Sequence, residues 1–218
     1  MSALTQDQRR FINVPAGCAC VLDFSKVDIK AQNITAVGTS ECYTCIGVYF
    51  AIDEHRCFIA HINPSTGRTS ADNDKDLERL VSADEGKTLG DFVLSRIRSA
   101  IGADWQPDMR AQRSLVLVCF RPSEGVHGAW LRPYVGHYVV KAITDYFSVD
   151  EAAVFYEGKH GFIVDQYDGI LQVLGFGEKE VMQAQDYGFQ HVAVQLAAFD
   201  AWVPVLKEDG SWCMVLKN

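Results

Sequence analysis

The chain lacks the features that mark a membrane span or a nucleic-acid surface. Its apolar runs, such as SLVLVCF, have the length of a strand rather than of a membrane helix. Lys and Arg number 20 against 28 Asp and Glu, which gives a net charge of -8, and the basic residues form no cluster. An acidic chain of this kind is a poor candidate for binding nucleic acid or an anionic membrane. We therefore expect neither partner, and a macromolecular partner is expected to be a protein.

The sequence also lacks a signal-peptide core and a regular cysteine framework. The first residues, MSALTQDQRRFINVPAG, contain no apolar stretch of the kind that targets a chain for secretion. The seven cysteines are odd in number and irregularly spaced. This pattern predicts reduced thiols in the cytoplasm. Delivery through a specialised secretion system, as for an effector or toxin, leaves little trace in a sequence and stays open.

What is present is the composition of an ordinary globular protein, with 48% apolar and 22% charged residues in 218. No internal repeat or low-complexity linker divides the chain, so we expect residues 1–218 to form a single domain. Short apolar segments rich in β-branched and aromatic residues predict strands. These segments are GCACVLDF, NITAVG, CIGVYFAI, RCFIAHI, SLVLVCF, GILQVLGF, HVAVQLAAF and WCMVLKN.

Two segments have a helical period instead. KTLGDFVLSRIRSAIG predicts a helix over residues 87–102 with Thr88 as its N-cap, and YVGHYVVKAITDYF predicts a second helix over residues 134–147. AAVFYE and FIVDQY flank the turn at residues 158–161 and predict a hairpin. Because strands and helices do not alternate one for one, the pattern predicts an α+β fold with mostly antiparallel or mixed sheets.

Cysteines and histidines gather in one stretch, residues 39–63, which is TSECYTCIGVYFAIDEHRCFIAHIN. Cys42 and Cys45 form a C-x-x-C, and with Cys18 and Cys20 they would supply the four sulfurs of a zinc site. However, Cys18 and Cys20 lie in an apolar strand-like run, which is more typical of small core residues. A thioredoxin-like pair requires a helix after the motif, whereas IGVYFAI has no helical face.

The same stretch also predicts a catalytic pair across a hairpin. If the turn is centred on Asp53 and Glu54, Cys45 at the start of one strand lies near His61 at the end of the other. A cysteine and histidine so placed can form the thiolate–imidazolium pair of a thiol nucleophile. Cys42 is then a bystander. The alternative is that Cys45 and His61 are ordinary residues of the hairpin.

In these positions the stretch resembles the cysteine–histidine glutamine/asparagine deamidase superfamily. That superfamily includes chemotaxis-receptor glutamine deamidases, N-terminal asparagine amidohydrolases and the catalytic domains of cytotoxic necrotising factor-like toxins. The matching residues are Cys45 at a strand start, His61 at the end of the next strand, and Thr39 six residues before the cysteine. The Thr44-Cys45 dipeptide and the ending AHIN resemble the asparagine amidohydrolase motif.

The resemblance implies packed β-sheets flanked by helices, and a mechanism without metal or cofactor. Cys45 would attack a side-chain carboxamide, His61 would transfer protons, and Thr39 would orient His61. Backbone N–H groups around Thr44 and Cys45 would stabilise the oxyanion. The implied substrate is a protein glutamine or asparagine, which becomes a carboxylate through a thioester. The resemblance leaves the choice between the two amides and the oligomeric state open.

Two other functions fit the same residues. The first is a non-catalytic protein-binding module that uses the polar loop at residues 63–76 together with Trp130 and Trp202. The second is a cysteine hydrolase of small amides, which no feature of the sequence excludes.

Overall fold

A computed structural model describes residues 9–31, 33–43, 45–62, 83–120, 123–126, 129–133, 135–175, 189–192, 203–206 and 212–215. The strands are β1 (Arg9–Asn13), β2 (Ala19–Asp23), β3 (Ile34–Thr39), β4 (Ile46–Ala51), β5 (Arg56–Ile62), β6 (Val116–Cys119), β7 (Ser123–Val126), β8 (Ala129–Pro133), β9 (Phe155–Glu157), β10 (Gly161–Asp165), β11 (Leu171–Leu174), β12 (Phe189–Val192), β13 (Val203–Leu206) and β14 (Trp212–Val215). The helices are α1 (Val27–Ala31), α2 (Ala83–Ile101), α3 (Met109–Ser114), α4 (Val135–Phe147) and α5 (Glu151–Val154).

Two five-stranded sheets form the centre of the fold. The first has the strand order β2-β5-β4-β6-β9, and we call it the helix-covered sheet because helices pack on one of its faces. The second has the order β11-β10-β3-β1-β12, and we call it the outer sheet. Both sheets are mixed, since β6–β9, β1–β3 and β1–β12 pair in parallel and the other neighbours pair antiparallel. Two hairpins, β7–β8 and β13–β14, complete the described strands.

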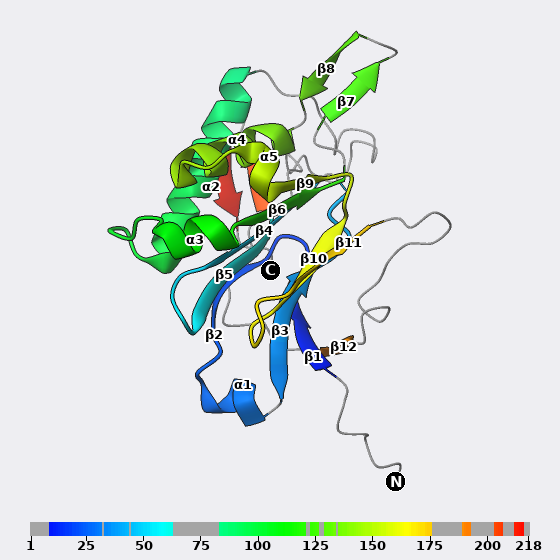
Figure 1. Cartoon of the computed structure of the whole chain (residues 1–218). Helices are drawn as coiled ribbons and strands as arrows, with labels where there is room; N and C mark the ends of the chain where they lie inside the picture. Colours follow the sequence, from blue (N-terminus) through cyan, green and yellow to red (C-terminus); the bar gives the residue numbers. More distant parts are fainter. Residues whose placement is uncertain are drawn as a thin grey trace.

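The elements stack in three layers, with the helices α2 to α5 on one side, the helix-covered sheet in the middle and the outer sheet on the other side (Figure 1). Residues of the helix-covered sheet alternate between its two faces, as strand geometry requires. Val48 and Phe50 of β4 pack in the core beneath the helices. Tyr49, between them, packs in the core that separates the two sheets. This second core, which we call the inter-sheet core, positions the candidate site.

The β4–β5 hairpin closes through a turn that the Asp53 side chain organises. Its carboxylate accepts hydrogen bonds from the backbone N–H groups of His55 (2.9 Å) and Arg56 (2.8 Å) and pairs with Arg56 Nε at 2.6 Å. The resulting loop is centred on Glu54, with Ala51 opposite Cys57. The turn therefore sets the register of the whole hairpin, including its far end.

The α+β class with mixed and antiparallel sheets is confirmed, and the sheets form one compact domain together with the helices. The predicted second helix is confirmed as α4, and the predicted β4–β5 hairpin is present. The first predicted helix is also present, but it begins at Ala83, so the prediction of Thr88 as its N-cap is wrong. Ala83 and the acidic pair after it extend the helix because they suit a helical N-terminal turn.

The predicted hairpin around residues 158–161 is also wrong. β9 pairs in parallel with β6 in the helix-covered sheet, whereas β10 pairs with β3 and β11 in the outer sheet. The chain crosses between the sheets here, through Gly158 at φ 73°. β6, the partner of β9, and β3, one of the two partners of β10, lie far away in the sequence, and a local turn pattern does not reveal them.

Some expectations lie outside the part of the chain that the structure describes. These are the loop at residues 63–76, Thr44, Trp202 and the side chain of Trp130. In the described part, no helix combines the length and the apolar character that a bilayer crossing requires.

We predict that Phe50→Ala lowers the free energy of unfolding by about 3–5 kcal/mol, measured by urea denaturation. The Phe50 ring contacts Phe58, Trp105 and Phe147 at centroid distances of 5.0, 5.5 and 4.9 Å, so its removal opens a cavity in the helix-side core. Tyr167, with 89% of its surface exposed, provides the control, because Tyr167→Ala should change stability by less than about 0.5 kcal/mol. Equal effects of the two changes would contradict this view of the core.

Candidate functional site

His61 lies near the end of β5 and faces the inter-sheet core, with only 2% of its surface exposed. Its backbone carbonyl accepts from Gly17 N and its N–H donates to Cys18 O, both at 2.8 Å. In an antiparallel sheet the backbone N–H and C=O of one residue point to the same neighbouring strand, which for His61 is the strand on the side of Gly17 and Cys18. The pair that His61 forms with Gly47 of β4 is therefore the closely spaced type without hydrogen bonds, with Cα atoms about 4.5 Å apart.

Thr39, the last residue of β3, holds the imidazole from the outer sheet. Its Oγ1 lies 2.8 Å from His61 Nδ1 and 2.7 Å from the carbonyl oxygen of Val14. Because a carbonyl only accepts, the Thr39 hydroxyl donates to Val14 and uses a lone pair to accept the proton of Nδ1. This arrangement fixes the tautomer of His61 and leaves Nε2 unprotonated as a base.

Cys42 contacts the same imidazole and ties the two sheets together. Its N–H donates to His160 O at 2.8 Å, and its carbonyl accepts from Phe120 N at 2.9 Å. Its Sγ lies 3.8 Å from both Nδ1 and Nε2 of His61. The sulfur therefore lies on the plane that passes through Cε1 midway between the two nitrogens. The lone pair of Nε2 points outward from the ring in a different direction. Cys42 thus packs against the imidazole without blocking that lone pair.

Cys45 lies immediately before β4, two residues from Gly47, and packs at the edge of the inter-sheet core. Strand alternation places it on the face of His61 at a diagonal position, where Cα atoms are about 7–8 Å apart. In the described residues no hydrogen bond joins Cys45 to His61. The Cys45 side chain is partly exposed, whereas that of Cys42 is fully buried.

The structure therefore corrects two details of the predicted pair. Gly47 lies opposite His61 and Cys45 lies two residues away at a diagonal position, because the loop is centred on Glu54. Cys42, expected to be a bystander, is in contact with the His61 ring. The expected contact between Thr39 and His61 is present as a hydrogen bond between their side chains.

Burial also sets the protonation of the pair. Loss of solvent raises the pKa of the Cys45 thiol to about 11. Burial lowers the pKa of His61 to about 4, and the nearby Val14 carbonyl opposes this change only in part. At neutral pH the resting site consequently holds a thiol and a neutral imidazole, so the expected thiolate–imidazolium pair is wrong for the resting state.

Gly47 is a site residue that the sequence reasoning missed. A Cβ at this position would lie 2.7 Å from Val118 Cγ2, 2.9 Å from Thr39 Cγ2 and 3.0 Å from Phe162 Cε1. Any side chain here would push Thr39 away from the position in which it holds His61. The available signal was a glycine in the interior of an apolar strand, which often marks the close approach of another group.

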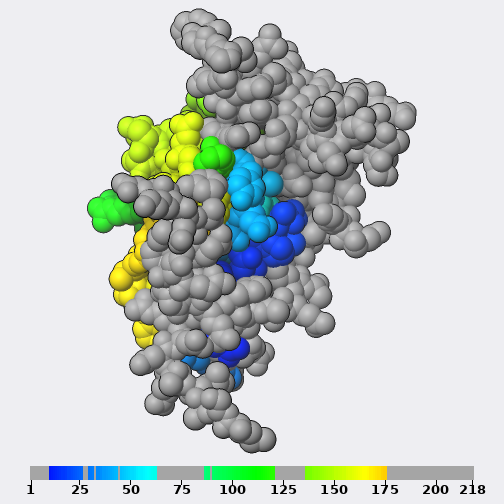
Figure 2. Space-filling model, turned by 90° about the vertical axis from the view of Figure 1, so that its right-hand side faces the viewer, coloured from blue at the N-terminus to red at the C-terminus, as the bar shows by residue number. Residues whose placement is uncertain are grey.

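Aromatic side chains form the rim beside the cysteines. Tyr43, with 47% of its surface exposed, meets Phe120 edge to face at 6.1 Å and stacks with His160 at 6.2 Å between ring centroids. Cys119 Sγ donates to Tyr43 O at 3.8 Å, which fixes the backbone of this loop. Figure 2 shows the light-blue surface of this segment next to the dark-blue N-terminal segment and a small green patch. The site thus adjoins an exposed aromatic surface.

Comparison with protein-family models finds no match to this chain, and no curated protein matches it. Over the described ranges, no three or more His, Cys, Asp or Glu side chains are grouped so that they could hold a metal ion. The chemistry must therefore be argued from Thr39, Cys42, Cys45 and His61 themselves.

We predict that His61 makes the protein less stable in acid. The unfolded state binds a proton near pH 6.5 and the folded state only near pH 4, so stability is lost as the pH falls between these values. The loss attributable to His61 is about 3 kcal/mol, measured as the free energy of urea unfolding at several pH values. His61→Gln should remove this part of the pH dependence. The exposed His55 provides the matched control. If His55→Gln reduces the pH dependence of the free energy of unfolding as much as His61→Gln does, the prediction is contradicted.

We also predict that Gly47→Ala destabilises the protein by about 1–3 kcal/mol, because the added methyl has no room. The NMR signals of the His61 ring should shift, since Thr39 must move. Thr39→Ser removes the Cγ2 atom that the methyl would meet but keeps the hydroxyl, so the double variant should regain part of the stability and of the His61 signal. A Gly47→Ala protein with unchanged stability and spectrum would refute this account.

Proposed function

We propose that this protein is a cysteine-dependent amidohydrolase that converts the side-chain amide of glutamine or asparagine in a protein to a carboxylate. In this proposal Cys45 is the nucleophile, His61 is the general base and acid, and Thr39 is a positioning residue. The observation that carries the proposal is the chain of hydrogen bonds from His61 Nδ1 through Thr39 Oγ1 to the Val14 carbonyl. Such a chain prepares a histidine for proton transfer through its other nitrogen.

Exposure and geometry favour Cys45 over Cys42 as the nucleophile. Cys42 is fully buried, so an amide on another protein has no access to its sulfur. Its sulfur also lies off the direction of the Nε2 lone pair. Cys45 is partly exposed and shares the face of His61 at a diagonal position, and the proposed reaction requires its side chain to rotate so that the thiol points towards Nε2.

The neutral resting pair suits a mechanism in which proton transfer accompanies attack. Nε2 of His61 takes the thiol proton while Sγ of Cys45 bonds to the amide carbon, which creates an oxyanion. The imidazolium that forms keeps its Nδ1 proton on Thr39 Oγ1, and the Val14 carbonyl fixes that hydroxyl in turn. Burial disfavours this charge, so the two oxygen acceptors lower the cost of forming it.

The remaining steps return the site to its starting state. The oxyanion collapses, the C–N bond breaks, and the imidazolium gives its proton to the departing nitrogen, which leaves as ammonia. Water then attacks the thioester with His61 again as base, the C–S bond breaks, and the sulfur regains its proton. The sum is amide plus water to carboxylic acid plus ammonia. In the described residues the Cys45 backbone N–H donates no hydrogen bond, which suits it to the oxyanion.

A protein substrate is favoured by the surroundings of the site. The exposed Tyr43 ring, which packs on Phe120 and the buried His160, offers an aromatic contact beside Cys45 for a folded partner with a projecting amide. The resemblance of Thr39, Cys45 and His61 to the glutamine/asparagine deamidases supports the same substrate class.

We predict that Cys45→Ala abolishes deamidation, with a loss of at least about a thousandfold, because the nucleophile is removed. Activity is measured as ammonia release and as conversion of amide to acid by mass spectrometry, on a panel of proteins, peptides and free glutamine and asparagine. Cys42→Ala is the matched control. It should lose far less, since Cys42 only packs against the imidazole.

The outcomes separate the candidate functions. Loss in Cys42→Ala with retention in Cys45→Ala would transfer the nucleophile to Cys42. Turnover of the free amides alone would indicate a small-amide hydrolase. No turnover of any substrate by the wild-type protein, together with specific binding of a protein, would indicate a binding module on this scaffold.

A further inference from the structure

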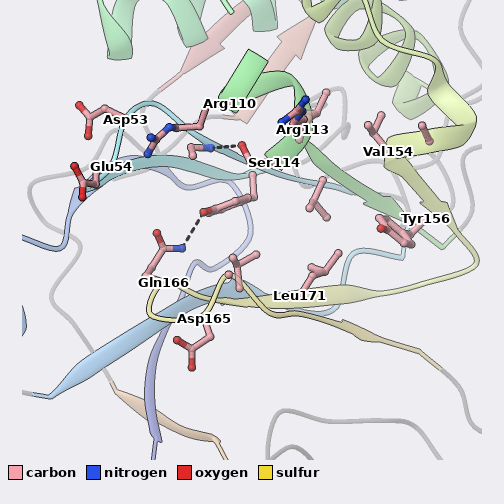
Figure 3. A pocket seen from close by; sticks show the side chains of 17 residues that line it. Asp53, Glu54, Arg110, Arg113, Ser114, Val154, Tyr156, Asp165, Gln166 and Leu171 are labelled. Carbon is pink, nitrogen blue, oxygen red and sulfur yellow. Dashed lines mark hydrogen bonds between the residues drawn. The ribbon is translucent and has the colours of Figure 1, made fainter. Parts of the chain in front are cut away.

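A cavity lies at the opposite end of the inter-sheet core from His61. This cavity has a volume of about 360 Å³ and lies between the β4–β6 side of the helix-covered sheet and the end of β10 (Figure 3). Its lining includes Tyr49 and Ala51 of β4 but not Gly47, the residue opposite His61. At about 3.3 Å per residue, Ala51 lies about 13 Å along the strand from Gly47. The cavity is therefore separate from the Thr39–His61 site.

The cavity has an apolar side and a cationic side. Val116, Val154, Val164, Leu171 and the ring of Tyr156 line the apolar side. Arg110 and Arg113, one helical turn apart on α3, line the other. In Figure 3 the two arginines lie above the space that Leu171 and Gln166 bound from below.

Arg110 and Arg113 both have exposed side chains, as Glu54 beside them does. Among the described residues, neither Arg110 nor Arg113 forms an ion pair. The nearby Asp53 carboxylate is already occupied by Arg56 and two backbone N–H groups. The Asp165 carboxylate accepts from Tyr167 N and points away from the cavity (Figure 3). Glu54 lies at the turn that borders the cavity and is exposed to solvent, where its charge is screened.

A hydrogen-bonded pair, Tyr49 and Gln166, lies between the two sides. Gln166 Nε2 donates to the Tyr49 hydroxyl at 2.8 Å, and both residues line the cavity. Burial raises the pKa of Tyr49 well above its usual value, so the phenol keeps its proton. Whichever way the carboxamide is turned, the pair leaves one donor and one acceptor for a ligand.

We infer that this cavity binds a small amphipathic organic acid, with its carboxylate at Arg110 and Arg113 and its apolar body against Val164 and Leu171. Guanidinium groups match the planar carboxylate with parallel hydrogen bonds, which a phenol or amide does not offer. The Tyr49–Gln166 pair would bind a polar substituent on the body. The cavity combines apolar side chains with several polar and charged groups, and its volume is in the range of small-molecule sites.

The test uses octanoate as the probe, with octanol and acetate as analogues that lack the charge and the apolar body. Binding to the full chain is followed by two-dimensional NMR titration. We expect octanoate to shift the amide signals around Val116, Val164 and Leu171, and to bind at least about tenfold more tightly than either analogue. Equal binding of octanol and octanoate, or octanoate shifts confined to other parts of the chain, would overturn the proposal.

Variants of the two arginines test where the carboxylate of octanoate binds. The Arg110→Gln/Arg113→Gln double variant should weaken octanoate binding at least about tenfold and leave octanol binding unchanged. Arg98→Gln makes the same kind of change on α2, where Arg98 lies 4.6 Å from the centre of the Tyr146 ring, and should leave octanoate binding unchanged. Equal weakening by the control, or none by the double variant, would refute the site. Cys45→Ala should not affect binding, so the result is independent of the proposed amidohydrolase activity.

Discussion

The hydrogen bond between Thr39 and His61 joins the two sheets at the place where the candidate chemistry lies. Thr39 belongs to the outer sheet, His61 to the helix-covered sheet, and the Val14 carbonyl that accepts the Thr39 proton follows β1 in the outer sheet. Three segments far apart in sequence thus determine which nitrogen of one imidazole is protonated. Gly47 and Cys42 contribute by shape, since one leaves room for Thr39 and the other packs against the ring.

Burial explains both the strength of this arrangement and its protonation. The low polarity of the inter-sheet core strengthens the Thr39–His61 hydrogen bond and makes an isolated charge costly. The cost lowers the pKa of His61 and raises that of Cys45, so the resting pair is neutral. In the proposed mechanism, charge develops only while a substrate is attacked, at the imidazole that Thr39 and Val14 already hold.

The inter-sheet core has two ends with different surroundings. At one end, Gly47 and Thr39 approach so closely that a side chain at position 47 has no room. At the other end the sheets separate around Tyr49 and enclose the cavity beside Arg110 and Arg113. Both ends use the same face of β4, so strand alternation alone places Gly47 and Tyr49 in the same layer.

The sequence by itself determined the elements and the residue types of the site. Periodicity identified α4 and the β4–β5 hairpin, because these depend on local alternation and a nearby turn. The hairpin pattern selected His61 and the resemblance to the deamidases selected Thr39, and the structure brings these two side chains together. The local pattern failed where distant partners decide the outcome, as in the separation of β9 and β10 between two sheets.

Only the tertiary structure decided the register and the electrostatics. The Asp53 hydrogen bonds centre the turn on Glu54, and this centre places Gly47 opposite His61 and Cys45 at a diagonal position. The contact of Cys42 with the ring depends on backbone bonds to His160 and Phe120, which are more than 75 residues away along the chain. Protonation of the pair depends on burial between two sheets, a property that no local pattern contains.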